Sequence, residues 1–178
     1  MASKGRPIRL RGARTWIGEI TQSLAKESAE EITKGLIQAG PWYSGEFAKN
    51  WAIEVGDKNI PADVEPRGRR ETEDTRNSIV PVAPSLRGTG AKQVVGYSIM
   101  NRVTYRDIAM DLIPGRVKKE SVDGEPINRI SAPEDWYRKF VESGPMTDLL
   151  KESVNVVAQN PKIRGFSKET SIIVDLEL

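Results

Sequence analysis

The chain has no cysteine and no histidine among its 178 residues. Disulfides, thiolate nucleophiles, imidazole bases and the commonest zinc ligands are therefore excluded together. It also lacks a phosphate-binding glycine loop, a Gly-x-Ser-x-Gly turn and any zinc-ligand spacing. We accordingly expect a protein that is not an enzyme, with no catalytic residues and with no metal or cofactor.

Long apolar runs are absent as well, and no stretch of about 18 apolar residues could span a membrane. The N-terminus has charge but no apolar segment of the secretory type. A mean hydropathy of -0.48 and a net charge of +2 are typical of a soluble globular chain. We expect a basic arm at residues 1–14 and one domain at residues 15–178.

The basic arm contains five cations and no acidic residue: Lys4, Arg6, Arg9, Arg11 and Arg14. Such an arm can lie along phosphates or an acidic neighbour, and binding of that kind weakens as salt rises. It can equally be a solvated terminus. Gly5, Pro7 and Gly12 argue against helix in this stretch.

Residues 15–39 are predicted to form one long amphipathic helix. Apolar residues recur there at steps of three and four, at Trp16, Ile20, Leu24, Ala25, Ala29, Ile32, Leu36 and Ala39. A helix of that length in a small domain commonly lies across a sheet. A coiled-coil strip is the alternative, which Gly18 and Gly35 weaken.

A turn motif follows the predicted helix. Pro41 stops a helix because proline has no amide hydrogen, and Ser44-Gly45 is a tight-turn pair. Phe47 and Trp51, four residues apart, would meet on one face of a helical turn that leads into an alternating strand at 51–55. From the residues alone this is a helix-to-strand corner with aromatic core anchors.

The pattern Pro-x-x-Ser-Gly-x-Phe-x-x-x-Trp after a long helix resembles the signature of neck, head-tail joining and tail-completion proteins of long-tailed bacteriophages, Pro-x-Asp-Thr-Gly-x-Leu-x-x-Ser-Trp. A second signature of these proteins is matched in order by Asn101, Tyr105, Asp111 and Gly115. The sequence departs from the two signatures at Tyr43, Ser44 and Arg106, and in the spacing of Asp111. The resemblance covers residues 15–115.

This resemblance implies a virion structural protein, assembled in the host cytoplasm, without membrane contact. Copies would form a closed ring, a hexamer, between a head-side connector or stopper ring and the tail-tube protein. Genomic DNA would pass through the lumen. The alternative from a different class is a small nucleic-acid-binding protein that uses the basic N-terminal arm.

Residues 56–92 are rich in proline, glycine and charge, and Arg67, Arg69 and Arg70 are candidate contacts to DNA or a partner. Because so long a connection is uncommon in compact domains, we predict a projecting loop or hairpin, with an edge strand at 79–82. Disorder is the other interpretation.

The rest of the chain predicts an α+β fold, with the long helix packed on a small, mostly antiparallel sheet. Residues 93–100 alternate as a central strand, and 105–113 form a short helix. A capping-box spacing at Ser131 and Glu134 precedes a helix that stops at Gly144-Pro145. A helix at 147–158 has Leu149, Leu150, Val154 and Val157 as its stripe, and a final strand occupies 171–178.

Two acidic pairs have the residue types that could act as magnesium ligands in a nuclease. Asp175 and Glu177 share a strand face, and Asp107 and Asp111 are four residues apart on a possible helix. No partner lysine or third carboxylate accompanies either pair, so solvated surface is the better interpretation.

Overall fold

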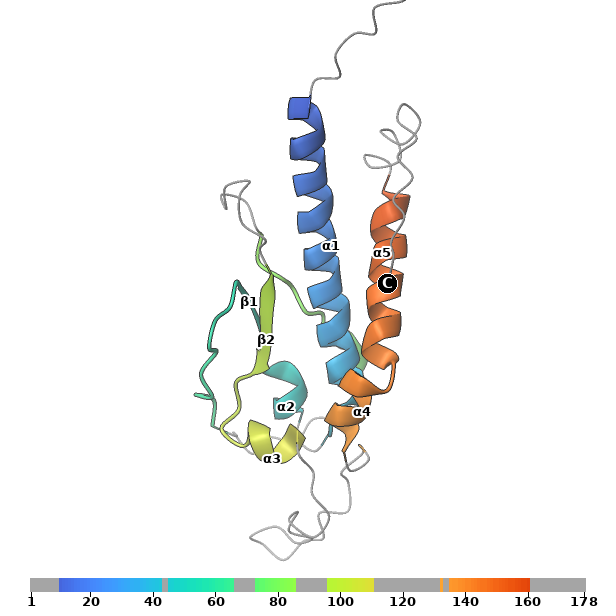
Figure 1. The fold of residues 1–178 in the computed structure, drawn as a ribbon. Helices are drawn as coiled ribbons and strands as arrows, with labels where there is room; N and C mark the ends of the chain where they lie inside the picture. Colours follow the sequence, from blue (N-terminus) through green and yellow to red (C-terminus); the bar gives the residue numbers. More distant parts are fainter. Residues whose placement is uncertain are drawn as a thin grey trace, which may run out of the picture.

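The computed structural model describes residues 10–42, 45–65, 73–85, 96–110, 132 and 135–160. The fold is α+β, with a long N-terminal helix, a two-stranded antiparallel sheet and C-terminal helices, as predicted. The long helix α1 lies in the middle, with the strands on one side and helix α5 on the other (Figure 1). The predicted final strand, residues 171–178, lies outside the described residues.

Helix α1 spans Leu10–Ala39, so it begins five residues before the predicted start at Thr15. The last part of the predicted arm, including Gly12, is therefore helical. One interior glycine costs a helix only about 1 kcal/mol, and Pro7 precedes the first helical residue and so does not interrupt it.

The buried face of α1 lies in its second half, where Ala29, Leu36 and Ile37 are each at most 5% exposed. Thr33 is fully buried on the same half and donates its hydroxyl to the Ala29 carbonyl at 2.7 Å. This bond within the helix lets a polar side chain sit in the core. The first half differs, because Ile17 is 56% exposed.

The sheet consists of β1 (Trp51–Val55) and β2 (Tyr97–Asn101), paired antiparallel with Ile53 opposite Ile99. The predicted strand at 51–55 is confirmed. Of the predicted strand at 93–100, residues 97–100 are in β2, and 93–95 lie outside the described residues. Just after the end of β2, Val103 forms an isolated parallel bridge with Val64. Among the described residues no third strand lies beside β1.

Of residues 56–92 the structure describes 56–65 and 73–85, so the projecting loop or hairpin stays a prediction. A 3-10 helix, η1 (Glu73–Ser78), opens the second part, and Ala83, only 3% exposed, donates its amide to Glu30 on α1 at 2.9 Å. The predicted edge strand at 79–82 is wrong, because these residues are in no strand. Pro81 lacks an amide hydrogen, and Val80 and Val82 are 76% and 73% exposed.

Three helices complete the fold: α3 (Arg106–Met110), α4 (Trp136–Glu142) and α5 (Pro145–Gln159). The helix at the predicted capping box begins at Trp136, after Asp135 in a left-handed conformation; Ser131 and Glu134 lie outside the described residues. Helix α5 starts at Pro145, two residues early, because proline fits the first turn of a helix.

The packed face of α5 differs from its predicted stripe. Val157 is buried as expected, but Leu150 and Val154 are 37% and 49% exposed. Ser153 takes their place in the core, fully buried, and its hydroxyl donates to the Leu149 carbonyl at 2.9 Å.

Candidate functional site

The turn motif begins where α1 ends. Gly40 donates its amide to the Leu36 carbonyl at 2.9 Å, the last bond of the helix. A Cβ at Gly40 would lie 3.2 Å from the Trp136 ring and 3.3 Å from the Phe47 ring. The chain therefore passes between two aromatic rings at a point where only glycine fits without displacement, and Pro41 follows it out of the helix.

Gly45 makes the turn that the sequence predicted. Its φ of 81° is in the left-handed region, which glycine adopts at little cost. It precedes the short helix α2 (Glu46–Lys49), and its carbonyl accepts the Lys49 amide at 3.0 Å. Ser44, the other predicted turn residue, lies outside the described residues.

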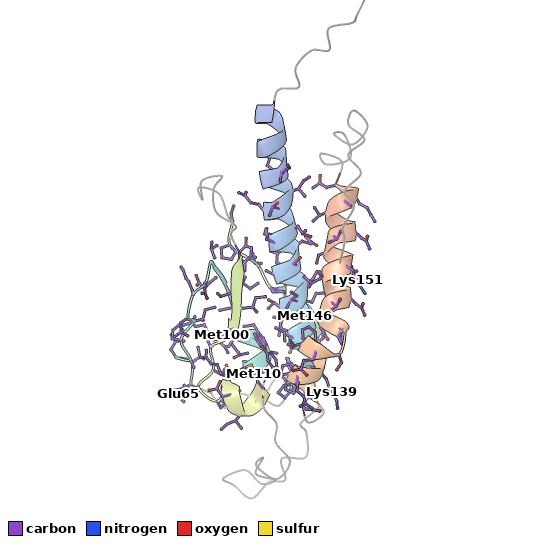
Figure 2. The ribbon with its side chains drawn as sticks, viewed as in Figure 1. Glu65, Met100, Met110, Lys139, Met146 and Lys151 are labelled. Carbon is purple, nitrogen blue, oxygen red and sulfur yellow. The ribbon has the colours of Figure 1, made fainter. Side chains whose placement is uncertain are left out.

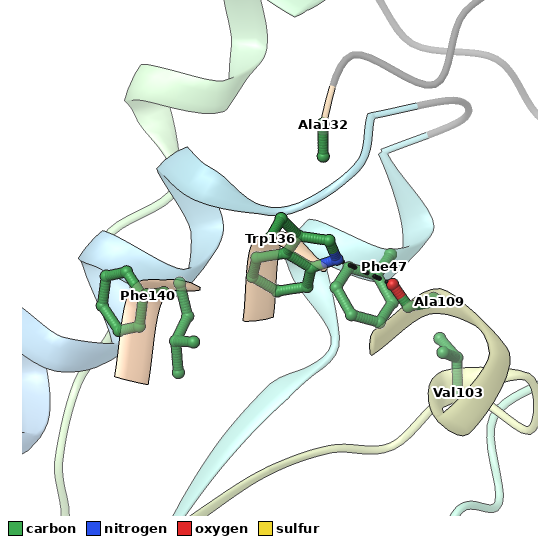
Figure 3. Close-up of a cluster of buried hydrophobic side chains, with 7 residues drawn as sticks. Phe47, Val103, Ala109, Ala132, Trp136 and Phe140 are labelled. Carbon is green, nitrogen blue, oxygen red and sulfur yellow. Dashed lines mark hydrogen bonds between the residues drawn. The ribbon is translucent and has the colours of Figure 1, made fainter. Parts of the chain in front are cut away.

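Phe47 is the centre of an aromatic cluster and is 4% exposed. Its ring meets Trp51 edge-on at 5.5 Å, as the four-residue spacing predicted. It also meets Trp136 edge-on at 6.0 Å and lies 6.5 Å from Tyr105. Figure 3 shows the Phe47 and Trp136 rings together above Val103 and Ala109.

Asn101 links the two sequence signatures and is fully buried. Its side-chain amide donates to the Phe47 carbonyl at 2.6 Å, and its side-chain oxygen accepts the Val103 amide at 3.1 Å. One side chain thereby holds the turn motif against the chain that leads to Tyr105. We call Phe47, Trp51, Asn101, Tyr105 and Trp136 the motif junction.

The C-terminal third of the chain joins the motif junction through Trp136. Its indole nitrogen donates to the Ala109 carbonyl at 2.8 Å (Figure 3). Phe140, one turn further along α4, packs in the same core. A segment that the family resemblance does not cover therefore closes the junction.

Similarity to known proteins adds nothing to this picture: no family model, no curated protein and no solved structure matches the chain.

Arg106 occupies a position where the resembled signature has alanine. Its guanidinium donates from Nη1 to the Ile60 carbonyl at 2.8 Å and to the Asn101 carbonyl at 3.0 Å. Arg106 thus links residues 56–65 to the end of β2. The sequence offered no sign of that bond.

A second contact that the sequence did not indicate joins Trp42 and Arg76. The Arg76 guanidinium lies over the Trp42 ring at 5.2 Å and donates from Nη1 to the Gln38 carbonyl at 2.6 Å. It thereby binds the C-terminal end of α1, where carbonyls lack helical partners. In sequence, Arg76 is indistinguishable from its charged neighbours.

Burial raises the pKa of Tyr105, which belongs to the motif junction, and the negative charge of Glu46 raises this pKa further. Tyr105 is therefore a neutral phenol at physiological pH, suited to packing against Phe47.

The candidate basic contacts are not brought together by the described residues. Arg11 and Arg14 are in the first turns of α1, whereas Lys4, Arg6, Arg9, Arg67, Arg69 and Arg70 lie outside the described part.

The candidate acidic pairs gain no support as metal ligands. Asp107 is 87% exposed and lies 3.7 Å from Arg106, while Asp111, Asp175 and Glu177 lie outside the described residues. Within the described ranges, no group of three acidic residues is placed to hold a metal ion. The described helices also include none that is long and apolar enough to cross a membrane.

Proposed function

We propose that this chain is a structural subunit of the neck of a long-tailed bacteriophage, a connector or tail-completion protein that joins head to tail. Identical copies would close into a ring, a hexamer by the resemblance, around a lumen for genomic DNA. Its partners would be the head-side connector or stopper ring and the tail-tube protein.

The observation that carries this proposal is the bond between Asn101 and the Phe47 carbonyl, which links positions 54 residues apart. Phe47 belongs to the first signature and Asn101 to the second. The bond between these two buried residues supports the interpretation that the two signatures belong to one structural unit. Gly45 has the left-handed conformation, and Trp51 the contact with Phe47, that are predicted from the residues of the first signature.

The fold also suits a subunit that acts by shape. Helix α1 has 30 residues and a length of about 45 Å at 1.5 Å per residue, and it is fixed to the sheet and to α5 along its second half. A long helix that is held in place by the rest of the fold presents the same surface in every copy. Heterologous contacts, in which two different faces of the subunit meet, close a ring when the same rotation repeats around an axis.

The segment with Arg67, Arg69 and Arg70 lies between two anchored stretches. Before it, Val64 bonds to the backbone of Arg102 and Thr104; after it, Arg76 binds α1. Because of their positive charge, we propose Arg67, Arg69 and Arg70 as contacts to a neighbouring ring or to DNA.

The test is the assembly state of the purified chain, measured by light scattering and electron microscopy over a range of concentrations. We expect closed rings with about six times the 19.8 kDa chain mass. A persistent monomer whose DNA affinity falls steeply with salt would instead identify the basic-arm nucleic-acid-binding protein.

A further inference from the structure

Residues 76–84, which we call the strap, lead from the C-terminal end of α1 back along that helix toward β2. The strap passes behind α1 in the view of Figures 1 and 2. At its first end, Arg76 donates from Nη1 to the Gln38 carbonyl at 2.6 Å. Ile79 packs beside this bond on the buried cluster that contains Trp42.

The second end of the strap is anchored on α1 about two turns before the first end. There the Ala83 amide donates to Oε1 of Glu30 at 2.9 Å, and the Tyr97 hydroxyl of β2 donates to the Pro84 carbonyl at 2.6 Å. Ala83 is 3% exposed and packs against Ala29 of α1. The strap therefore covers apolar side chains at both of its ends.

Between these ends the strap makes little contact with the rest of the fold. Val80 and Val82 are 76% and 73% exposed, so their side chains contribute little packing. Within the described ranges, no backbone ladder joins the strap to α1 or to either strand. The strap is thus attached at its ends, through side-chain hydrogen bonds and the burial of Ile79 and Ala83.

The strap is also stiff, because it contains Pro81 and Pro84. Proline fixes its own φ and restricts the preceding residue to extended backbone, and the preceding residues here are Val80 and Ala83. A stiff segment has few conformations in which one end is released and the other stays bound. Release of either end should therefore release both.

We propose that the strap opens and closes as one unit while α1 and the sheet stay folded. Segments open locally where few apolar contacts and few backbone bonds are lost, and opening of the strap breaks no hydrogen bond within α1 or between the strands. The open form uncovers Trp42 at one end and Ala29 and Ile53 at the other. This inference does not rest on a role in the phage neck.

Amide hydrogen exchange of the full-length chain, followed by NMR, measures this opening. The Ile79 amide donates to the Arg76 carbonyl at 3.2 Å, and the Ala83 amide to Glu30, so each end of the strap has a reporter. Their protection factors should agree within about three-fold, because one opening exposes both amides. Both should lie at least about ten-fold below that of Thr33, which is fully buried on α1 and reports the main fold.

Variants at one end are read at the amide of the other end, whose own hydrogen bond they leave intact. Tyr97→Phe removes the bond to Pro84 and should speed exchange of the Ile79 amide about five-fold. Arg76→Ala should speed exchange of the Ala83 amide at least as much, measured relative to Thr33 in the same variant.

Tyr105→Phe is the matched control, because it removes a tyrosine hydroxyl from the motif junction and not from the strap. It should leave the ratio of Ile79 to Thr33 exchange unchanged. Strap amides that exchange only as fast as Thr33, or that have no protection, would overturn the proposal. So would a Tyr97→Phe effect confined to Ala83, or an Arg76→Ala effect confined to Ile79, because the two ends would then be independent. None of these results bears on ring assembly, so the neck proposal is tested separately.

Discussion

The side-chain amide of Asn101 donates to the backbone carbonyl of Phe47 at 2.6 Å, in a position with no solvent exposure. The same side chain accepts the Val103 amide, so both of its polar ends are used. Trp51 pairs with Asn101 across the sheet and packs on Phe47. The three residues form a closed set in which the turn, the first strand and the end of the second strand fix one another.

Removal of the Asn101 side chain should therefore be costly. Asn101→Ala leaves a buried carbonyl and a buried amide without partners, and we expect a loss of about 3 kcal/mol in the free energy of unfolding. Urea unfolding followed by tryptophan fluorescence measures it. Asn77→Ala is the matched control, because Asn77 is exposed and accepts a surface hydrogen bond from Gln38. It should change the free energy of unfolding by no more than about 0.5 kcal/mol. Equal costs for the two variants would contradict the linking role of Asn101.

Two glycine substitutions should have opposite signs. Gly45→Ala forces a side chain into a left-handed conformation and should destabilise the chain by about 1 kcal/mol. Gly18→Ala, in the first half of α1 with no described atom within 4 Å of the new Cβ, should stabilise the chain by about 0.5–1 kcal/mol. Thermal midpoints of the two variants provide the comparison. A neutral Gly45→Ala would show that the turn does not depend on glycine.

The same substitution at two tryptophans separates a bonded indole from an unbonded one. Trp136→Phe leaves the Ala109 carbonyl without its hydrogen-bond donor. The buried Trp51 indole nitrogen has no acceptor among the described residues, so Trp51→Phe removes an unsatisfied donor. Trp136→Phe should be the more destabilising by at least about 1 kcal/mol. Urea midpoints monitored by circular dichroism decide the order, and a larger loss at Trp51 would refute it.

The raised pKa of Tyr105 predicts a loss of stability at alkaline pH. The folded chain holds the phenol proton more tightly than the unfolded chain, whose ordinary value is 10.0. This contribution is complete below pH 10.0 and disappears as the pH rises through the folded value. The free energy of unfolding of the parent should fall more steeply above about pH 10 than that of Tyr105→Phe. Tyr97 also has a raised pKa, through burial and then Glu30, and contributes equally to both curves. Parallel curves would mean that Tyr105 is not shifted.

Local chemistry explains which parts of the fold were predictable. Gly40, Pro41 and Gly45 act through their own backbone preferences, and the strand at 51–55 alternates clearly, so sequence reading placed the corner and β1 well. The four-residue spacing of Phe47 and Trp51 was enough to predict their contact.

Two kinds of feature could not be predicted from the sequence: polar residues in the core and bonds between distant segments. Thr33 and Ser153 are core residues because each hydroxyl bonds a carbonyl four residues earlier, which hydrophobicity does not register. Residues 79–82 have strand composition, yet they form no ladder, and Ala83 beside them bonds α1 instead. The bonds of Asn101 and Arg106 join segments dozens of residues apart, and only the folded chain specifies them.

The neck role is tested most directly on phage particles. Antibodies against this chain, applied to purified long-tailed particles from a host that carries its gene and viewed by electron microscopy, should label the junction between head and tail. Particles that assemble fully and contain none of this chain would contradict the proposal.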